Sequence, residues 1–127
     1  MRRRILDVAV FVVVALTAFI PVIANPRTAP RDIVLVARDM TFYLEGSDVP
    51  NPTIVVKRGE DVRVVVRNED TGITHGFSVP ALKTSIDRIQ PGATTKLSWR
   101  APAESGRHEY VCLPHAQMMK GVLLVAD

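Results

Sequence analysis

Apolar and polar residues alternate with a period of two along most of the chain after residue 31. The clearest case is the run from Asp61 to Asn68, in which Val62, Val64 and Val66 share one face. Shorter runs with strand-like composition lie at residues 33–36, 40–44, 53–57, 77–79, 94–100, 108–112 and 122–126. We predict a strand in each of them. Residues 80–89 have no clean period and are expected to be irregular.

Turn-forming residues separate these runs, as at residues 46–52, 68–72, 91–92 and 101–106. Helical spacing with capping signals appears only in the N-terminal segment. Seven or eight short strands with turns between them in roughly 100 residues are typical of a β-sandwich. The sequence therefore predicts an all-β fold.

The first 24 residues differ from the rest. Three arginines at positions 2–4 precede an apolar run over residues 5–24, close to the ~20 residues that span a bilayer and longer than the ~7–15 of a signal peptide. We expect a retained membrane anchor, with cleavage after Ala24 as the alternative. The arginines should stay in the cytoplasm, so either outcome places the domain in the periplasm or another extracytoplasmic space.

A Pro-rich spacer over residues 25–31 should link this segment to a single domain over residues 32–127. The net charge of +3 arises from the N-terminus, because the rest of the chain is close to neutral. No Lys/Arg stripe interleaved with aromatic residues is present in the sequence, which argues against a nucleic-acid partner.

Candidate chemistry is concentrated in the segment YVCLPHAQMMKG near the C-terminus. It contains the only cysteine, Cys112, followed by His115, Met118 and Met119. A thiolate, an imidazole and a thioether are ligands that favour copper over magnesium, calcium or manganese. In an oxidising compartment a single cysteine has no disulfide partner in its own chain, which also favours a metal ligand.

A mononuclear copper site of this type needs a second imidazole. His75 is the better candidate because it follows a loop and begins a strand, although a loop histidine with ordinary hydrogen bonds is the alternative. His108 lies four residues before Cys112 on one strand, roughly 13 Å away at ~3.3 Å per residue, so we expect a structural role.

Four carboxylates lie in predicted turns, at Glu60, Asp61, Glu69 and Asp70. Paired carboxylates can serve acid–base catalysis. Because these turns should be solvated, we expect no catalytic role for them.

Two motifs together resemble one family. The pattern N-E-D-x-x-x-x-H-G-F-S-V-P, followed by G-x-x-x-Y-x-C-x-x-H-x-x-M-M-x-G, resembles the cupredoxins, the blue-copper family that includes plastocyanin and amicyanin. It is also similar to the copper domain of cytochrome oxidase subunit II and to nitrosocyanin. The resemblance implies a Greek-key β-sandwich holding one copper ion with His75, Cys112, His115 and Met118. Met119, which fits a Met-x-Gly ending, is the alternative axial ligand.

This sequence differs from two of these relatives at the metal site. A single cysteine excludes the binuclear centre of the oxidase domain, and nitrosocyanin has a glutamate where this chain has His75. We therefore expect an exported type 1 copper protein that carries single electrons and is not an enzyme, with a cytochrome or membrane oxidase as redox partner. Copper handling, or a role as accessory module of a membrane oxidase, is one alternative, and a small copper enzyme of nitrosocyanin type is another.

Overall fold

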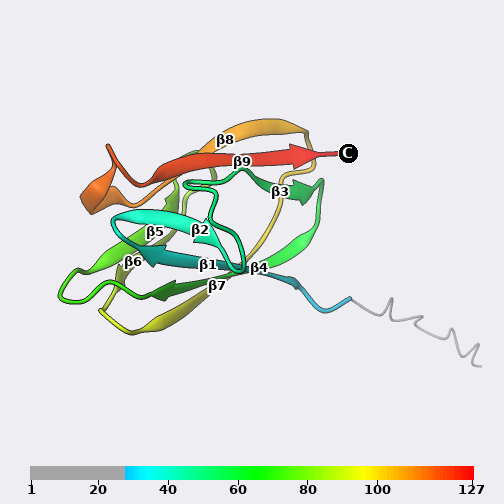
Figure 1. The fold of residues 1–127 in the computed structure, drawn as a ribbon. Coiled ribbons are helices and arrows are strands. Elements are labelled where there is room, and N and C mark those ends of the chain that lie inside the picture. Colours follow the sequence, from blue (N-terminus) through cyan, green and yellow to red (C-terminus); the bar gives the residue numbers. More distant parts are fainter. Residues whose placement is uncertain (1–27) are drawn as a thin grey trace, which may run out of the picture.

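Two β-sheets enclose one core in the part of the protein that the computed structural model describes, residues 28–127 (Figure 1). The first sheet has the strand order β2-β1-β4-β7, with strands at Thr41–Leu44, Arg31–Arg38, Asp61–Asn68 and Thr94–Arg100. The second has the order β3-β9-β8-β5-β6, with strands at Ile54–Lys57, Lys120–Ala126, Gly106–Val111, His75–Val79 and Thr84–Ile89. Two short 3₁₀ turns, η1 (Pro80–Leu82) and η2 (Leu113–His115), follow β5 and β8. The predicted all-β sandwich is confirmed.

The residues buried in the core are those that the alternating pattern predicts. Val62, Val64 and Val66 of β4 are buried between the sheets, and Arg63 and Arg67 lie on the other face. Three core aromatic rings, Phe42, Phe77 and Tyr110, contact one another with centroids 5.6–6.1 Å apart.

The described residues contain nine strands, one more than the largest number expected. The additional strand is β6, inside the segment 80–89 that we expected to be irregular. Its pairing with β5 has an irregular register between His75 and Phe77. As a result its two buried residues, Ile86 and Ile89, are three positions apart, and the insertion of an extra residue hides the period of two.

Strand pairing between distant segments brings the candidate ligands to one end of the sandwich. β5 and β8 are antiparallel neighbours in the second sheet, with Ser78 opposite Val111. When this register is continued along both strands, the beginning of β5 lies beside the residues that follow β8. His75 is the first residue of β5 and Cys112 comes directly after β8, so this pairing directs the two side chains to a common region.

The proposed anchor, its cleavage site and residues 25–27 of the linker lie outside the described residues. No helix within residues 28–127 has the length and apolar composition needed to cross a bilayer.

A glycine opposite a buried tyrosine provides a test of the packing. Gly121 of β9 pairs with Tyr110 of β8, whose hydroxyl donates a hydrogen bond to the Pro52 carbonyl at 2.7 Å. A Cβ at position 121 would overlap the Tyr110 ring and hydroxyl. We expect Gly121→Ala to lower the free energy of unfolding by about 1–3 kcal/mol, measured by chemical denaturation.

Gly106→Ala is the matched control, because Gly106 lies in β8 and its added Cβ would meet only the His108 ring at 3.7 Å. It should leave stability within about 0.5 kcal/mol of the wild type. Equal effects of the two substitutions would contradict the proposed overlap with Tyr110.

Candidate metal centre

Three side chains of the described residues converge at this end of the sandwich. His75 Nδ1 lies 3.2 Å from His115 Nδ1 and 3.9 Å from Cys112 Sγ, and Cys112 Sγ lies 3.5 Å from His115 Nδ1. They form the one group of metal-binding histidine, cysteine and acidic side chains found within residues 28–127. The three ligands predicted from the sequence therefore lie together.

The spacing of these three atoms fits a single metal ion. A first-row metal binds imidazole nitrogen at about 2.0–2.1 Å and thiolate sulfur at about 2.3 Å. Donor atoms 3.2–3.9 Å apart can surround one ion at such bond lengths. Two imidazoles and one thiolate are the trigonal donor set of electron-transfer copper.

Backbone hydrogen bonds fold the loop that carries Cys112 and His115. The N–H of Cys112 donates to the Met119 carbonyl at 2.9 Å and closes the loop at its base. The His115 N–H donates to the Cys112 carbonyl, also at 2.9 Å. Pro114 lies in the first turn of η2, where its missing N–H leaves no helical bond unmade. The loop therefore turns tightly enough to return the His115 ring to Cys112.

The structure corrects the choice of axial methionine. Met118, which we expected to bind the metal, has 53% of its surface exposed. Met119 is fully buried and belongs to the same apolar cluster as Cys112. The reason is that the Met118 and Met119 N–H groups both donate to the His115 carbonyl, at 3.0 Å. The turn therefore contains one more residue, and Met119, the alternative, is the methionine that we assign to the copper donor set.

The Cys112 thiol is fully buried. The backbone N–H of Gly76 donates to its sulfur at 3.3 Å. Burial raises the pKa of the thiol, and hydrogen bonds from Gly76 and His115 oppose this without cancelling it. The metal-free thiol therefore stays protonated near neutral pH, and metal binding must release that proton.

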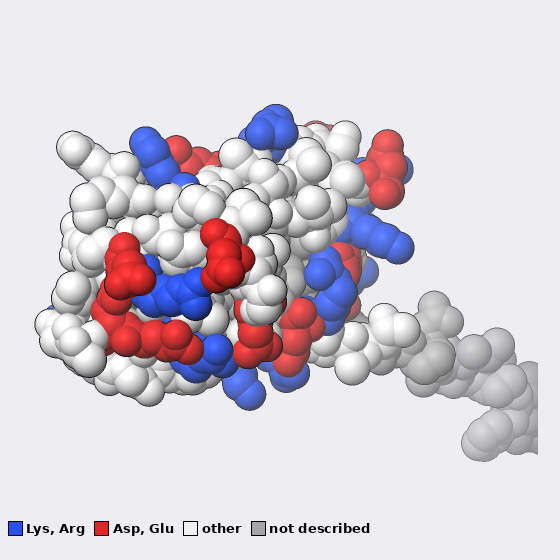
Figure 2. Space-filling view, in the orientation of Figure 1, with Lys and Arg blue, Asp and Glu red and all other residues white. Residues whose placement is uncertain are grey.

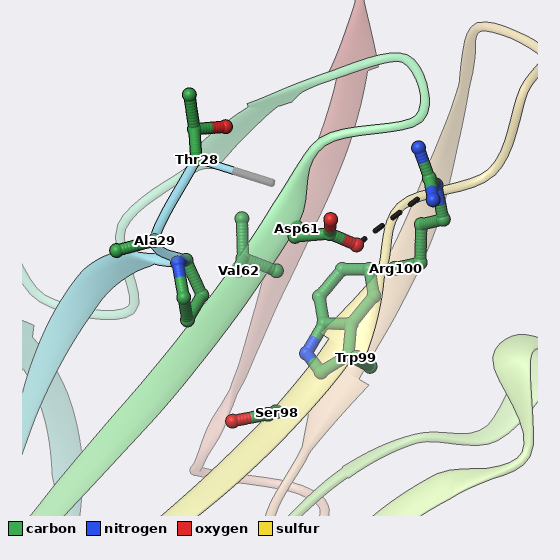
Figure 3. Close-up of a pocket in the computed structure, with 8 residues that line it drawn as sticks. Thr28, Ala29, Asp61, Val62, Ser98, Trp99 and Arg100 are labelled. Carbon is green, nitrogen blue, oxygen red and sulfur yellow. Dashed lines mark ion pairs between the residues drawn. The ribbon is translucent and has the colours of Figure 1, made fainter. Parts of the chain in front are cut away.

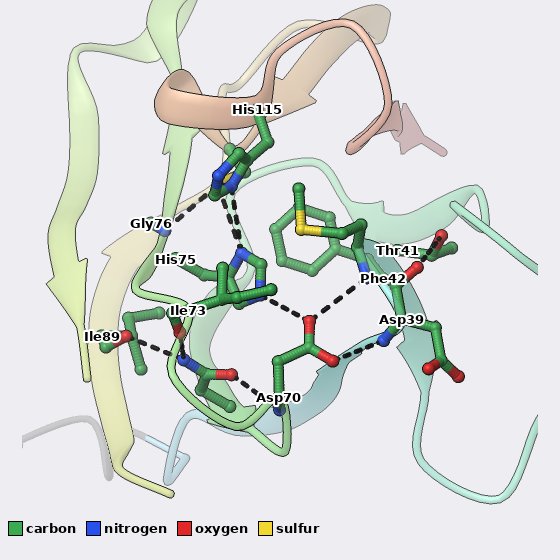
Figure 4. Close-up of polar contacts among 12 residues, drawn as sticks. Asp39, Thr41, Phe42, Asp70, Ile73, His75, Gly76, Ile89 and His115 are labelled. Atoms are coloured by element: carbon green, nitrogen blue, oxygen red, sulfur yellow. Dashed lines mark hydrogen bonds and ion pairs between the residues drawn. The ribbon is translucent and has the colours of Figure 1, made fainter. Parts of the chain in front are cut away.

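His75 is fully buried, and its second ring nitrogen contacts a carboxylate. Nε2 lies 2.7 Å from Asp70 Oδ2, and Figure 4 shows the ring between Asp70 and His115. The expectation that Asp70 is a solvated turn residue is wrong, because only 12% of its side chain is exposed. Its place in the N-E-D-x-x-x-x-H motif was the available signal, since a metal-binding histidine commonly donates its other N–H to a carboxylate.

His115 lies at the surface end of the site. The ring is partly buried, and exposed residues of its own loop surround it. Leu113 is 60% exposed, and a hollow of about 330 Å³ lies beside His115, lined by Pro114, Ala116, Gln117 and Met118. Leu82, in η1, is partly buried and packs against the core. The exposed apolar surface is therefore formed mainly by residues 113–118.

His108 and the remaining hollows lie apart from these ligands. His108 is in β8 opposite Leu123 and does not belong to the metal-binding group. A larger hollow of about 530 Å³ is lined by residues 28–30, Asp61, Trp99 and Arg100, among others (Figure 3). Asp61 pairs there with Arg100 at 3.9 Å. This hollow contains none of the predicted ligands.

Charged side chains of both signs gather on another face of the molecule. Figure 2 shows acidic residues around basic ones on one side of the sandwich. Arg38 pairs with Asp48 at 2.6 Å, and Arg67 pairs with Glu45 and Glu69 at 3.0 and 2.8 Å. Because these charges neutralise one another, they do not form a basic surface of the kind that binds nucleic acid.

Known structures share this fold. Auracyanin from the photosynthetic bacterium Roseiflexus castenholzii is 18% identical over 79% of this chain and 100% of its own, with a TM-score of 0.60. Rusticyanin from Thiobacillus ferrooxidans is 22% identical over 75% and 76%, with a TM-score of 0.55. The metal-binding domain of the Cu(I)-exporting P-type ATPase CopA from Streptococcus pneumoniae D39 is 16% identical over 76% and 85%, also at 0.55. At these identities the likeness is evidence of fold alone.

A family model gives the more specific assignment. The sequence has no significant match among curated proteins. The model of the cupredoxin-like domain matches residues 9–125, which include all four residues of the copper donor set. The chain belongs to the cupredoxin-like domain family.

Proposed function

We propose that this protein is a mononuclear blue-copper electron carrier. The observation that supports this most strongly is the convergence of His75 Nδ1, Cys112 Sγ and His115 Nδ1 within 3.9 Å of one another, with Met119 buried next to Cys112 in the loop. A copper ion held there would supply reversible one-electron exchange between Cu(II) and Cu(I).

The protein contributes a rigid set of ligands. His75 is fixed by Asp70 and by burial, and Cys112 is fixed by the Gly76 N–H and by its backbone bond to Met119. Ligands held in this way cannot rearrange easily when the charge of the metal changes. Little motion is then needed for electron transfer, which suits a carrier.

The surface around His115 is suited to a short-lived complex. His75 and Cys112 are fully buried, so the partly buried His115 ring is the ligand nearest to a partner. The apolar side chains of Leu113 and Met118 lie on the same loop and are more than half exposed. Transient redox complexes use small interfaces. We propose a redox protein, such as a cytochrome or a membrane oxidase, as the partner.

We propose that this carrier is exported, and the N-terminal sequence supports the proposal. Three arginines before a long apolar run favour an anchor, or a signal cleaved near Ala24, with the domain on the extracytoplasmic side. A lone buried cysteine that binds metal is compatible with an oxidising compartment, where disulfides rather than free thiols are the rule.

Copper handling is the second candidate. The similar CopA domain was solved with Cu(I) and belongs to a copper exporter, so the same fold can serve transport. The two functions differ in how readily the metal leaves. A carrier must retain copper through many redox cycles, whereas a copper donor must release it. A copper enzyme is less favoured, because it needs a free coordination position for its substrate, and His75 and Met119 would both occupy positions on the metal.

The spectrum of the copper-loaded protein tests the site. We expect Cu(II) to give the intense visible absorption and narrow copper hyperfine splitting of blue copper. Cys112→Ser should abolish both signals, because they require the thiolate. A weak spectrum in the wild type, with loss of copper to a chelator within minutes, would favour copper handling instead.

The axial ligand can be assigned with two matched substitutions. Met119→Leu should raise the reduction potential and alter the copper spectrum, because the loss of a thioether from the site weakens the binding of Cu(II). Met118→Leu changes an exposed side chain on the same loop and should leave both properties close to the wild type. Voltammetry and visible spectroscopy provide the measurements. The opposite ranking would restore Met118 as the ligand.

The docking surface is tested through the rate of electron transfer. Leu113→Glu places a charge on the exposed apolar surface and should slow electron exchange between two copies of the protein, measured by NMR line broadening in mixtures of the oxidised and reduced forms. Val55→Glu is the control, because Val55 is also about half exposed but lies on β3. Equal rates for the two variants would contradict docking at residues 113–118.

A further inference from the structure

The Asp70 carboxylate accepts hydrogen bonds from three sides. Oδ2 contacts His75 Nε2 at 2.7 Å and accepts from the Met40 N–H at 3.2 Å, and Oδ1 accepts from the Asp39 N–H at 2.6 Å (Figure 4). Among the described residues Asp70 forms no ion pair with a lysine or arginine. Its charge is therefore compensated by backbone dipoles and by the histidine.

Two of these bonds stabilise an unusual turn. Asp39 and Met40 connect β1 to β2, where Arg38 pairs with Thr41. Both have positive φ, at 50° and 55°, a conformation that is unfavourable for a residue such as methionine. Because Asp70 accepts both N–H groups, the turn between β1 and β2 is tied to the loop that leads to His75.

A buried asparagine fixes Asp70 from the other side. Asn68 Oδ1 accepts the Asp70 N–H at 3.0 Å, and Asn68 Nδ2 donates to the Ile73 carbonyl at 2.7 Å and the Ile89 carbonyl at 3.0 Å. Asn68 is 1% exposed. The loop between β4 and β5 is thus cross-linked by hydrogen bonds, and the carboxylate has little freedom to turn away from His75.

The contact determines which His75 nitrogen is free to bind metal. A carboxylate accepts a hydrogen bond from a protonated Nε2, so the ring carries its proton on Nε2 and its lone pair on Nδ1. Nδ1 is the nitrogen that faces Cys112 and His115. Both Asp70 oxygens act as acceptors, Oδ1 for the Asp39 N–H and Oδ2 for the Met40 N–H and the His75 ring, which is the hydrogen-bonding pattern of an ionised carboxylate.

We propose that Asp70 is a positioning residue of the metal centre, which fixes the tautomer and orientation of His75 and lowers the reduction potential of the bound metal. This inference rests on the proposed function. A partly buried negative charge one imidazole away from the metal stabilises the more positive oxidised ion more than the reduced one. A histidine with a neutral hydrogen-bond partner would lack this bias.

The test is Asp70→Asn, which keeps the shape and an acceptor oxygen but removes the charge. We expect the affinity for Cu(II) to fall about 10–100-fold, the affinity for Cu(I) to fall less, and the reduction potential to rise. Each tenfold difference between these two losses corresponds to about 59 mV for one electron. Asp70→Glu, which retains the charge, should have a potential closer to the wild type than Asp70→Asn.

Glu69→Gln is the matched control. It removes a unit charge from the adjacent position of the same loop, where the carboxylate is 40% exposed and pairs with Arg67. Its potential should stay near that of the wild type. A shift as large as that of Asp70→Asn, or no shift in Asp70→Asn, would overturn the inference.

If Asp70→Asn does not fold, the tautomer of His75 can be measured in the metal-free wild type. NMR of the ring nitrogens of His75 should show a proton on Nε2 and none on Nδ1. A proton on Nδ1 instead would overturn the role of Asp70. Because this readout does not need copper, it stays informative if the protein fails to show a blue-copper spectrum, a result that would count only against the proposed function.

Discussion

The metal centre depends on the antiparallel pairing of β5 with β8. Ser78 lies opposite Val111, so the first residue of one strand and the residue after the other meet at one edge of the sheet. A shift of one residue would turn the inward side chains of either strand outward. The buried Phe77 and Tyr110, whose rings stack with centroids 5.6 Å apart, oppose such a shift. The packing of the core therefore sets the distance between His75 and Cys112.

A second constraint is the cost of burying polar groups at this edge. His75 and Asn68 are almost completely buried, and an unpaired polar group in such a place costs about 1–3 kcal/mol. Each of them is paired, His75 with Asp70 and Asn68 with the carbonyls of Ile73 and Ile89. The bonds that satisfy these groups also hold the ligand loop in place, so stability and preorganisation have a common origin.

The strands of the sandwich and three of the metal ligands could be predicted from the sequence, because each depends on a pattern within a short segment. The alternation in β4 and the spacing of Cys112 and His115 are visible in single segments. The strand β6 has no visible period in the sequence, because a register irregularity interrupts its pairing with β5. Residue spacing favours Met118 over Met119, because it does not reveal the backbone hydrogen bonds of the turn after His115. The contacts of Asp70 with residues 39 and 40 join segments far apart in the sequence and leave no periodic signal, whereas its contact with His75 lies within the N-E-D-x-x-x-x-H motif.

The two histidines have different surroundings, and this asymmetry defines separate tasks. His75 has a carboxylate on its far nitrogen and no exposed surface, so it can adjust the energy of the oxidised metal without meeting a partner. His115 lies on an exposed apolar loop, where it can conduct an electron but has less control over the charge of the site. The potential and the docking surface can therefore change independently, because Asp70 contacts His75 in the interior whereas the exposed apolar residues lie on the loop of His115.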